Sequence, residues 1–339
     1  MITARLTKWA FWCLFFLGYA GAAPPLAAEV TPPDALAYSR RLWRSADGLP
    51  EDLAQSLAQT PDGYLWIGTS GGLVRFDGTS FAVFNRENTP AFRDDSVYTL
   101  LAARDGALWA GTEGGGLVRY RHGVFRAFGA AEGLSNGFVR VIFEDRAQRL
   151  WIGTDAGLFR LQDEMLSRVD GKSGAPTISV HAICEDRAGR LLVGGWGLLI
   201  LSEQGAAYYS STESQADNSI RTIHQTADGA IWVGTISGLR RLPHSPRDNP
   251  FTTPRILSDL NISVLRESRN GQLWVGSYGQ GLLRYTAGRF VKFSAPSMLP
   301  HNNVLALFED GEDDVWVGTQ GGLLRLSPSV ASTITAADG

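Results

Sequence analysis

One pattern of apolar and polar positions returns seven times along the chain. In a typical copy, the apolar segment 97–102 is followed by an Asp-Gly turn, the apolar segment 108–112, a glycine-rich turn and two more apolar segments that end at Phe128. One position is a tryptophan in every copy but the fourth, and its residues are Trp66, Trp109, Trp151, Leu192, Trp232, Trp274 and Trp316. Subtraction of these numbers gives a period of 40 to 43 residues. Short strands that recur at this period are typical of propeller blades, each of which is one small antiparallel sheet.

Two apolar columns support strands rather than helices. The first column contains Ala54, Val97, Val139, Val180, Ile220, Ile262 and Val304. The second lies three residues further on and contains Leu57, Leu100, Ile142, Ile183, Ile223, Leu265 and Leu307. A blade that lies between two neighbours is apolar on both faces, so nearly continuous apolar segments are expected in place of strict alternation.

The last copy lacks its fourth strand. After Leu326 the sequence turns to Ser-Pro-Ser, and no segment with an aromatic pair follows. The segment 38–44 matches the missing strand and stands before the first copy. Pairing of the two ends would remove the free edges of the sheets. We therefore predict an all-β fold, a closed seven-bladed β-propeller over residues 38–326 with four-stranded antiparallel blades and a ring closed by the N-terminal strand, followed by a C-terminal tail or linker at 327–339.

The first 28 residues have the features of a signal peptide. Arg5 and Lys8 precede an apolar run over 9–23, and small residues lie near Ala28. We expect cleavage before Glu29 and a spacer over 29–37, and thus a periplasmic or secreted protein, or one associated with the membrane in a longer parent protein. The alternative is an uncleaved membrane anchor. Cys184 would be the one cysteine of the mature chain, and we expect it to be a small buried hydrophobe.

Composition and charge narrow the possible partners. The 39 glycines suit a chain with many tight turns, and a net charge of -3 provides no basic field for nucleic acid. The five histidines show no metal-ligand spacing. We expect no nucleic acid partner, no cofactor, no metal and no catalytic residue.

The repeated residues are interpreted as structural. One tryptophan per blade indicates packing between blades, with sugar stacking as the alternative. In the Gly-Thr pairs, glycine would admit the neighbouring backbone. We expect the recurring arginines to pair with acids or carbonyls between blades; they are Arg75, Arg119, Arg160, Arg240, Arg284 and Arg325.

One column is polar and variable where the others are fixed. It lies between the two apolar columns and contains Gln55, Tyr98, Arg140, His181, Arg221, Ser263 and Leu305. A second polar position includes Asn136, and loops on the same face add Glu113, Trp196 and Tyr278. Polar loops around a propeller channel favour ligand binding. The predicted ligand-binding residues are Tyr98, Glu113, Asn136, Arg140, His181, Trp196, Arg221 and Tyr278, for a sugar or an anionic small molecule; the alternative is an ordinary solvated channel mouth.

The repeat resembles a known family. Residues 62–78 read DGYLWIGTSGGLVRFDG and follow DGLP at 47–50, which is similar to the two-component regulator propeller repeat of bacterial sensor proteins. The resemblance covers residues 38–326 and implies the exported, ligand-sensing part of a membrane protein with a histidine kinase, a diguanylate cyclase or a DNA-binding regulator at its cytoplasmic end.

The sequence also departs from that family. It has seven repeats where many relatives have about twice as many, and it has no immunoglobulin-like module, second membrane span or output domain. The prediction is therefore an exported input domain without its own output domain, which binds a small molecule or oligosaccharide and has a membrane-bound sensor kinase or cyclase as a partner. The alternatives are a protein-interaction scaffold and a propeller lyase or glycosidase.

Overall fold

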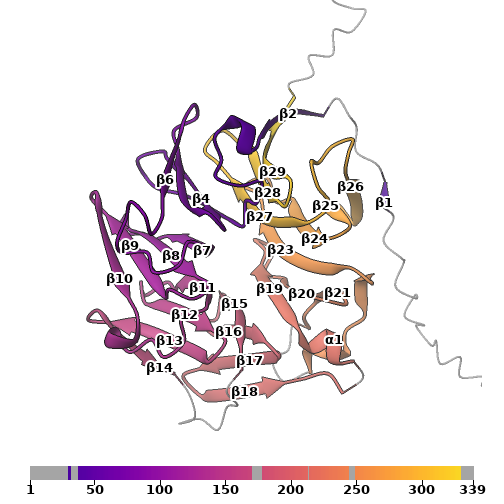
Figure 1. The fold of residues 1–339 in the computed structure, drawn as a ribbon. Helices are drawn as coiled ribbons and strands as arrows, with labels where there is room; N and C mark the ends of the chain where they lie inside the picture. Colours follow the sequence, from indigo (N-terminus) through magenta and orange to yellow (C-terminus); the bar gives the residue numbers. More distant parts are fainter. Residues whose placement is uncertain (1–29, 32–36, 170–177, 213, 244–248, 330–339) are drawn as a thin grey trace, which may run out of the picture.

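Seven small antiparallel sheets surround a central channel in the computed structural model (Figure 1), as the sequence predicts. The structure describes residues 30–31, 37–169, 178–212, 214–243 and 249–329. The predicted signal peptide lies outside the described residues, as do residues 330–339 of the predicted tail. None of the helices in the described ranges has the length and apolar character that a bilayer crossing needs.

The strands follow one another from the channel to the rim in six of the blades. Blades one to three contain β3 (Ser56–Gln59), β4 (Leu65–Thr69), β5 (Gly72–Phe76) and β6 (Phe81–Phe84); β7 (Val97–Ala102), β8 (Leu108–Thr112), β9 (Leu117–Arg121) and β10 (Val124–Phe128); and β11 (Val139–Glu144), β12 (Leu150–Thr154), β13 (Gly157–Gln162) and β14 (Met165–Arg168). Blades four to six contain β15 (Val180–Glu185), β16 (Leu191–Gly195), β17 (Gly197–Ser202) and β18 (Gly205–Tyr209); β19 (Ile220–Gln225), β20 (Ile231–Thr235), β21 (Gly238–Arg241) and β22 (Arg255–Ser258); and β23 (Asn261–Glu267), β24 (Leu273–Tyr278), β25 (Gly281–Thr286) and β26 (Arg289–Phe293). The helical turns are η1 (Ser45–Asp47), η2 (Ala130–Glu132), α1 (Gln215–Asn218) and η3 (Pro250–Thr252).

Blade seven combines the two ends of the propeller. It contains β27 (Val304–Glu309), β28 (Val315–Thr319), β29 (Gly322–Pro328) and, at its rim, β2 (Tyr38–Trp43). β2 pairs antiparallel with β29, from Tyr38 opposite Pro328 to Trp43 opposite Leu323. The predicted ring closure is confirmed, and in Figure 1 the indigo β2 lies beside the yellow β29. β29 extends two residues into the predicted tail because Tyr38 and Ser39 continue the pairing past Leu326.

The closing strand joins three sheets through aromatic contacts. The Trp43 ring stacks on Trp316 with centroids 5.3 Å apart and meets Phe76 of blade one edge-on, also at 5.3 Å. Tyr38 lies edge-on to Phe293 of blade six at 5.8 Å. In addition, β1 (Val30–Thr31), which lies in the predicted spacer, pairs in parallel with β26.

The tryptophan column is buried, as predicted. Trp66 and Trp274 have at most 2% of their surface exposed, and the indole N–H of Trp66 donates to Thr60 Oγ1 at 2.8 Å. The arginine column is only partly as expected. Arg119 pairs with Glu164 of the next blade at 3.2 Å, but the guanidinium of Arg75 lies over the Tyr64 ring at 4.5 Å in its own blade. Stacking on aromatic faces is a second, unpredicted role of this column.

The Gly-Thr pairs make close contacts between blades. A Cβ on Gly153 would lie 2.5 Å from Val180 Cγ1 of the next blade, so no larger residue fits. The adjacent Thr154 donates from Oγ1 to the Gly157 carbonyl at 3.1 Å, which closes the following turn. Cys184 is only half-buried, and burial raises the pKa of its thiol to about 11.

Candidate functional site

In six of the seven blades a β-bulge in the innermost strand directs one side chain toward the channel. In blade three the pairing of β11 with β12 is interrupted between Val139 and Val141, and Arg140 lies at the interruption. Bulges of this kind turn a side chain away from the regular pleat. The same irregularity occurs in blades two to seven at Tyr98, Arg140, His181, Arg221, Ser263 and Leu305. The polar column of the sequence therefore faces the channel while its apolar neighbours pack between blades.

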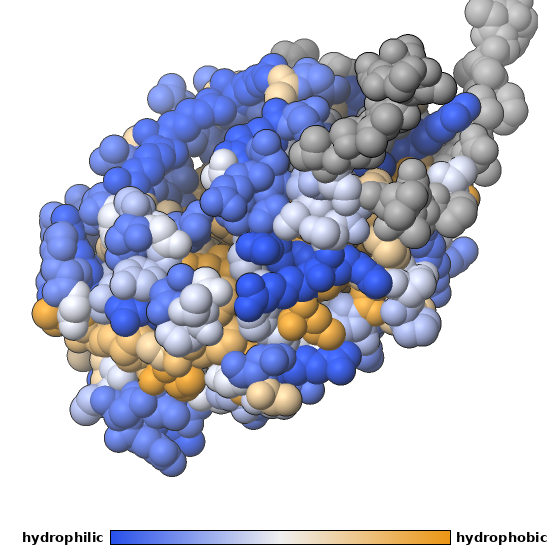
Figure 2. Space-filling model, turned by 90° about the horizontal axis from the view of Figure 1, so that it is seen from above, coloured by the Kyte–Doolittle hydropathy of each residue, from blue (hydrophilic) through white to orange (hydrophobic). Residues whose placement is uncertain are grey.

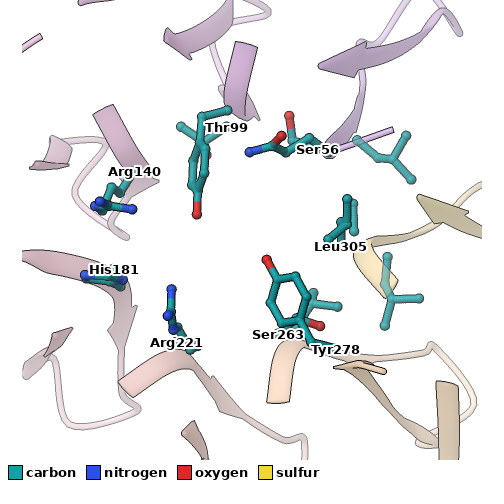
Figure 3. Close-up of a pocket in the computed structure, with 14 residues that line it drawn as sticks. Ser56, Thr99, Arg140, His181, Arg221, Ser263, Tyr278 and Leu305 are labelled. Carbon is teal, nitrogen blue, oxygen red and sulfur yellow. The ribbon is translucent and has the colours of Figure 1, made fainter. Parts of the chain in front are cut away.

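These residues enclose a cavity of about 240 Å³. Figure 3 shows the side chains of Arg221 and Tyr278 extending into the space that Arg140, His181, Ser263 and Leu305 surround. Gln55 and Tyr98 complete the polar part of the wall. Of the eight predicted ligand-binding residues, the structure thus brings together Tyr98, Arg140, His181, Arg221 and Tyr278.

The other three predicted residues do not line this cavity. Trp196 is 51% exposed, and its carbonyl accepts a hydrogen bond from the Tyr208 hydroxyl at the edge of blade four. Asn136 uses Oδ1 to accept from the Phe138 N–H at 2.9 Å, which holds the loop before β11. Glu113 is exposed, and its N–H donates to the Ser96 carbonyl at 3.0 Å. Spacing in the sequence indicates which end of a strand a residue lies at, but it carries no information on radial distance from the channel.

Arg140 is held by an acid and an aromatic ring. Its Nη2 donates to Asp155 Oδ2 at 2.9 Å, and Nε donates to the other carboxylate oxygen. The guanidinium carbon lies 4.0 Å from the centre of the Phe138 ring. The hydrogen bonds from Arg140 are the main reason why the pKa of Asp155 is below its ordinary value. Phe138 is not among the predicted site residues, although it stands two positions before the channel arginine in the sequence.

His181 is neutral and is held by Ser179. Ser179 Oγ donates to Asp155 Oδ1 at 2.7 Å, so its oxygen accepts from His181 Nε2, 3.0 Å away. Burial, together with the positive charges of Arg140 and Arg221, lowers the pKa of His181 to about 4. The imidazole is therefore uncharged at neutral pH.

Arg221 differs from Arg140 in having no acidic partner. No carboxylate among the described residues lies within 4 Å of its guanidinium, and its buried Nε has no hydrogen-bond partner there. Nearby, burial raises the pKa of the Tyr278 hydroxyl, which keeps this group a neutral hydrogen-bond donor. The cavity thus combines one uncompensated cation with several neutral donors.

The contacts around Ser179 differ from those of an activated nucleophile. In such a site the imidazole accepts the hydroxyl proton and a carboxylate orients the imidazole. Here the carboxylate of Asp155 accepts the hydroxyl proton itself. Within the described ranges, no group of three or more His, Cys, Asp or Glu side chains is arranged to hold a metal ion.

Comparison with known proteins supports the repeat assignment. The family model described as "Two component regulator propeller" matches residues 48–71, 133–156, 214–237 and 298–321. No curated protein sequence matches the chain. Each matched segment runs from the loop before an innermost strand to the turn that follows the second strand of that blade.

Several solved structures share the fold. The extracellular domain of the putative hybrid two component system BT3049 from B. thetaiotaomicron has a TM-score of 0.77 at 21% identity, over 86% of this chain and 42% of that one. The extracellular domain of the putative one component system BT4673 from the same organism has a TM-score of 0.69 at 20% identity, over 87% and 40%. Virginiamycin B lyase from Staphylococcus aureus has a TM-score of 0.66 at 15% identity, over 86% and 99%.

The chain spans about two fifths of the first two structures, and at these identities the likeness concerns the fold. The match to the family model is independent of the fold, because it rests on the sequence of the repeat. The first matched segment, 48–71, overlaps the phrases at 47–50 and 62–78 that resemble the repeat of bacterial sensor propellers. The chain is a seven-bladed propeller in which four segments match the repeat described as "Two component regulator propeller".

Proposed function

We propose that this propeller is the exported, ligand-sensing module of a bacterial signal-transduction system and that it binds a small anionic molecule in the channel cavity. The family of its repeats supports the sensing role, as does the fold shared with extracellular domains of two component systems. In this proposal the propeller lies in the periplasm or outside the cell. A membrane-bound sensor kinase or cyclase is its signalling partner.

The observation that carries the ligand class is the unpaired guanidinium of Arg221. Arg221 is half-buried and its Nε is buried without a hydrogen-bond partner, so an anion that enters the cavity would supply a missing counter-charge and a missing acceptor. Arg140 adds little net charge because Asp155 neutralises it. A carboxylate or phosphate bound to Arg221 would also lie beside His181 and Tyr278, which line the same cavity and provide neutral polar groups.

Cavity size limits the ligand. Pockets for drug-sized ligands usually have 300 to 1,000 Å³, and the channel cavity has about 240 Å³. It suits a small organic acid, or one acidic sugar unit of an oligosaccharide whose remaining units lie outside. Hydroxyl groups of such a ligand would find partners in Gln55 and Ser263.

The alternative functions have weaker support. A scaffold would need a large apolar patch. Figure 2 shows hydrophilic side chains over most of the visible face, with hydrophobic ones in separate patches. A lyase is the second candidate because virginiamycin B lyase shares the fold. However, Ser179 donates its hydroxyl proton to Asp155 and not to His181, which favours ligand binding over nucleophilic catalysis.

A ligand screen tests the proposal. Thermal unfolding would be followed with small carboxylates, sugar phosphates, uronic acids and the matching neutral sugars. We expect anionic compounds, and not their neutral analogues, to raise the unfolding temperature of the parent and of Trp196→Ala. Arg221→Gln should lose the effect. Stabilisation by neutral sugars alone, or an equal response of the parent and Arg221→Gln, would contradict the proposal.

A further inference from the structure

The turn between the first and second strands of a blade reaches across to the next blade. In four blades the second residue of this turn is an arginine, namely Arg104, Arg146, Arg187 and Arg269. Arg104 Nη1 donates to the Asp145 carbonyl at 3.0 Å, and Arg146 Nη1 donates to the Arg187 carbonyl at 3.2 Å. Arg187 donates in the same way to Ala227, and Arg269 to Asp310. At each of these four junctions between blades, the guanidinium of the turn arginine thus lies against the next blade.

The junction that closes the ring has no such arginine. Blade seven has Gly311 at the equivalent position, and a Cβ built there would have no atom within 4 Å. The acceptor side of blade one is nevertheless in place. Gln59 Nε2 donates to the Gly63 carbonyl at 3.0 Å, just as Gln225 Nε2 donates to the Gly229 carbonyl at 3.0 Å.

The two glutamines differ in the hydrogen bonding of the side-chain oxygen, Oε1. Gln225 Oε1 accepts a hydrogen bond from the Arg187 N–H at 2.8 Å. No hydrogen bond to Gln59 Oε1 is present within the described ranges. Gln59 Oε1 therefore lacks the backbone N–H that the equivalent side chain accepts at five other junctions; the junction between blades one and two has Pro61, which has no N–H to donate.

A cavity of about 640 Å³ occupies this closing junction, which we name the seam pocket; Gln59, Thr60, Pro61, Asp310, Gly311 and Glu312 line its mouth. The equivalent positions between blades four and five enclose about 240 Å³, with Arg187 in the wall. The seam pocket is thus larger than its counterpart, and no arginine side chain from the turn of blade seven enters it.

The charge of the seam pocket suits a cation. Asp77, Asp310 and Glu312 contribute carboxylates. Hydrogen bonds from Ser80 and Thr79 lower the pKa of Asp77, so it stays ionised. The one cation in the wall, Arg325, pairs with Asp314 at 3.4 Å.

The aromatic rings of the seam pocket are already in use. Trp43 and Trp316 are buried and stack on each other, and the guanidinium groups of Arg41 and Arg325 lie 4.7 Å and 5.7 Å from their ring centres. The groups left for a guest are therefore the carboxylates, which a planar guanidinium pairs with through two N–H donors, whereas a lysine ammonium is a compact and more strongly hydrated charge.

We infer that the seam pocket binds a guanidinium group that is supplied by another molecule, either a small guanidinium compound or an arginine side chain of a peptide. The acidic groups alone would not carry this inference. The second observation is that the equivalent positions of the same fold hold a guanidinium at four other junctions. The inference is independent of the channel cavity and of the proposed sensing role.

Calorimetric titration tests the inference with three probes: agmatine, the blocked tripeptide acetyl-Gly-Arg-Gly-amide and its lysine analogue. We expect both guanidinium probes to bind the parent, and the lysine analogue to bind about fivefold more weakly. Gly311→Arg should supply the guanidinium within the chain and reduce probe affinity about tenfold or more. Ala227→Arg is the matched control, because it adds the same side chain at the same turn of blade five and leaves the seam pocket open.

A second variant covers the case in which Gly311→Arg does not fold. Glu312→Gln removes an exposed carboxylate and should weaken the guanidinium probes about threefold. Tighter binding of the tripeptide than of agmatine would indicate a peptide source, and the reverse a small molecule; either supports the site. No binding of either guanidinium probe, equal affinity for the lysine analogue, or the same loss in Ala227→Arg as in Gly311→Arg would overturn the inference.

Discussion

Arg140 and Asp155 form a two-point ion pair at the wall of the channel, with Arg140 Nη2 2.9 Å from Asp155 Oδ2. The neighbouring channel arginine, Arg221, has no carboxylate within 4 Å among the residues described. The two arginines are therefore not equivalent. Arg140 is neutralised in place, and the charge of Arg221 is left for a ligand.

Asp155→Asn should strengthen anion binding. The substitution keeps the size of the side chain but removes the charge that neutralises Arg140, so the cavity would hold two uncompensated guanidinium groups. We expect the affinity for a small anion found in the ligand screen to rise about three- to tenfold, a range typical of one added charge contact. Calorimetric titration of parent and variant measures the change. Unchanged or weaker binding would show that Arg140 does not face the ligand.

Stability should fall in weak acid because of His181. Its pKa is about 4 in the folded protein against an ordinary value of 6.5, so the unfolded chain takes up a proton first as the pH falls. The stability from this group is complete above about pH 6.5 and is lost progressively as the pH approaches 4. His224 has a similar pKa, lowered by burial and by Arg266, and adds to the same slope.

The contribution of His181 can be isolated by substitution. Urea unfolding of His181→Gln between pH 7.5 and 4.5 should show a smaller loss of stability with acid than the parent, because the variant has no imidazole to protonate. Equal slopes for parent and variant would mean that the histidine is not buried as a neutral group.

Trp43→Ala should weaken ring closure. Trp43 is 5% exposed and contacts both Trp316 and Phe76, so its removal empties space between blades seven and one. Deletion of a buried tryptophan side chain costs about 3 to 5 kcal/mol. Trp196→Ala is the matched control, since Trp196 is 51% exposed and its loss should change stability by no more than about 0.5 kcal/mol. Urea unfolding followed by far-ultraviolet circular dichroism compares the two; similar midpoints would argue against the closure described here.

Gly318→Ala tests the close approach of the blades at the same junction. A Cβ at Gly318 would lie 2.4 Å from the Ala54 carbonyl oxygen, a backbone atom that cannot rotate away. Overpacking of this kind costs about 1 to 3 kcal/mol. Gly311→Ala serves as the control because its Cβ would meet no atom within 4 Å. Thermal unfolding should separate the two variants, and a stable Gly318→Ala protein would contradict the packing.

Repetition made the fold readable from the sequence. The tryptophan period fixed the number of blades, and the missing fourth strand of the last copy fixed the ring closure between β2 and β29. The polar column was also visible, because Arg140 and His181 stand between apolar positions that are otherwise constant. That these side chains reach the channel depends on the bulges in the innermost strands, which the pattern does not encode directly.

Other features depend on where individual side chains lie in three dimensions. Trp196 lies on the predicted face but outside the cavity, since its radial position follows from the packing of blade four. Arg140 pairs with Asp155 of its own blade while Arg221 has no acid within 4 Å among the described residues, a difference that follows from where the side chains at the ends of these strands point. Likewise, the stacking of Arg75 on Tyr64 follows from side-chain geometry that a column of arginines does not reveal.

The central claim is that Arg221 provides the charge that binds an anion in the channel. The most direct test is a calorimetric comparison of parent and Arg221→Gln with one carboxylate that stabilises the parent and with its neutral amide. The account predicts that the variant loses about tenfold or more in affinity for the carboxylate and that the parent prefers the carboxylate to the amide. Equal carboxylate affinity in the two proteins would contradict it.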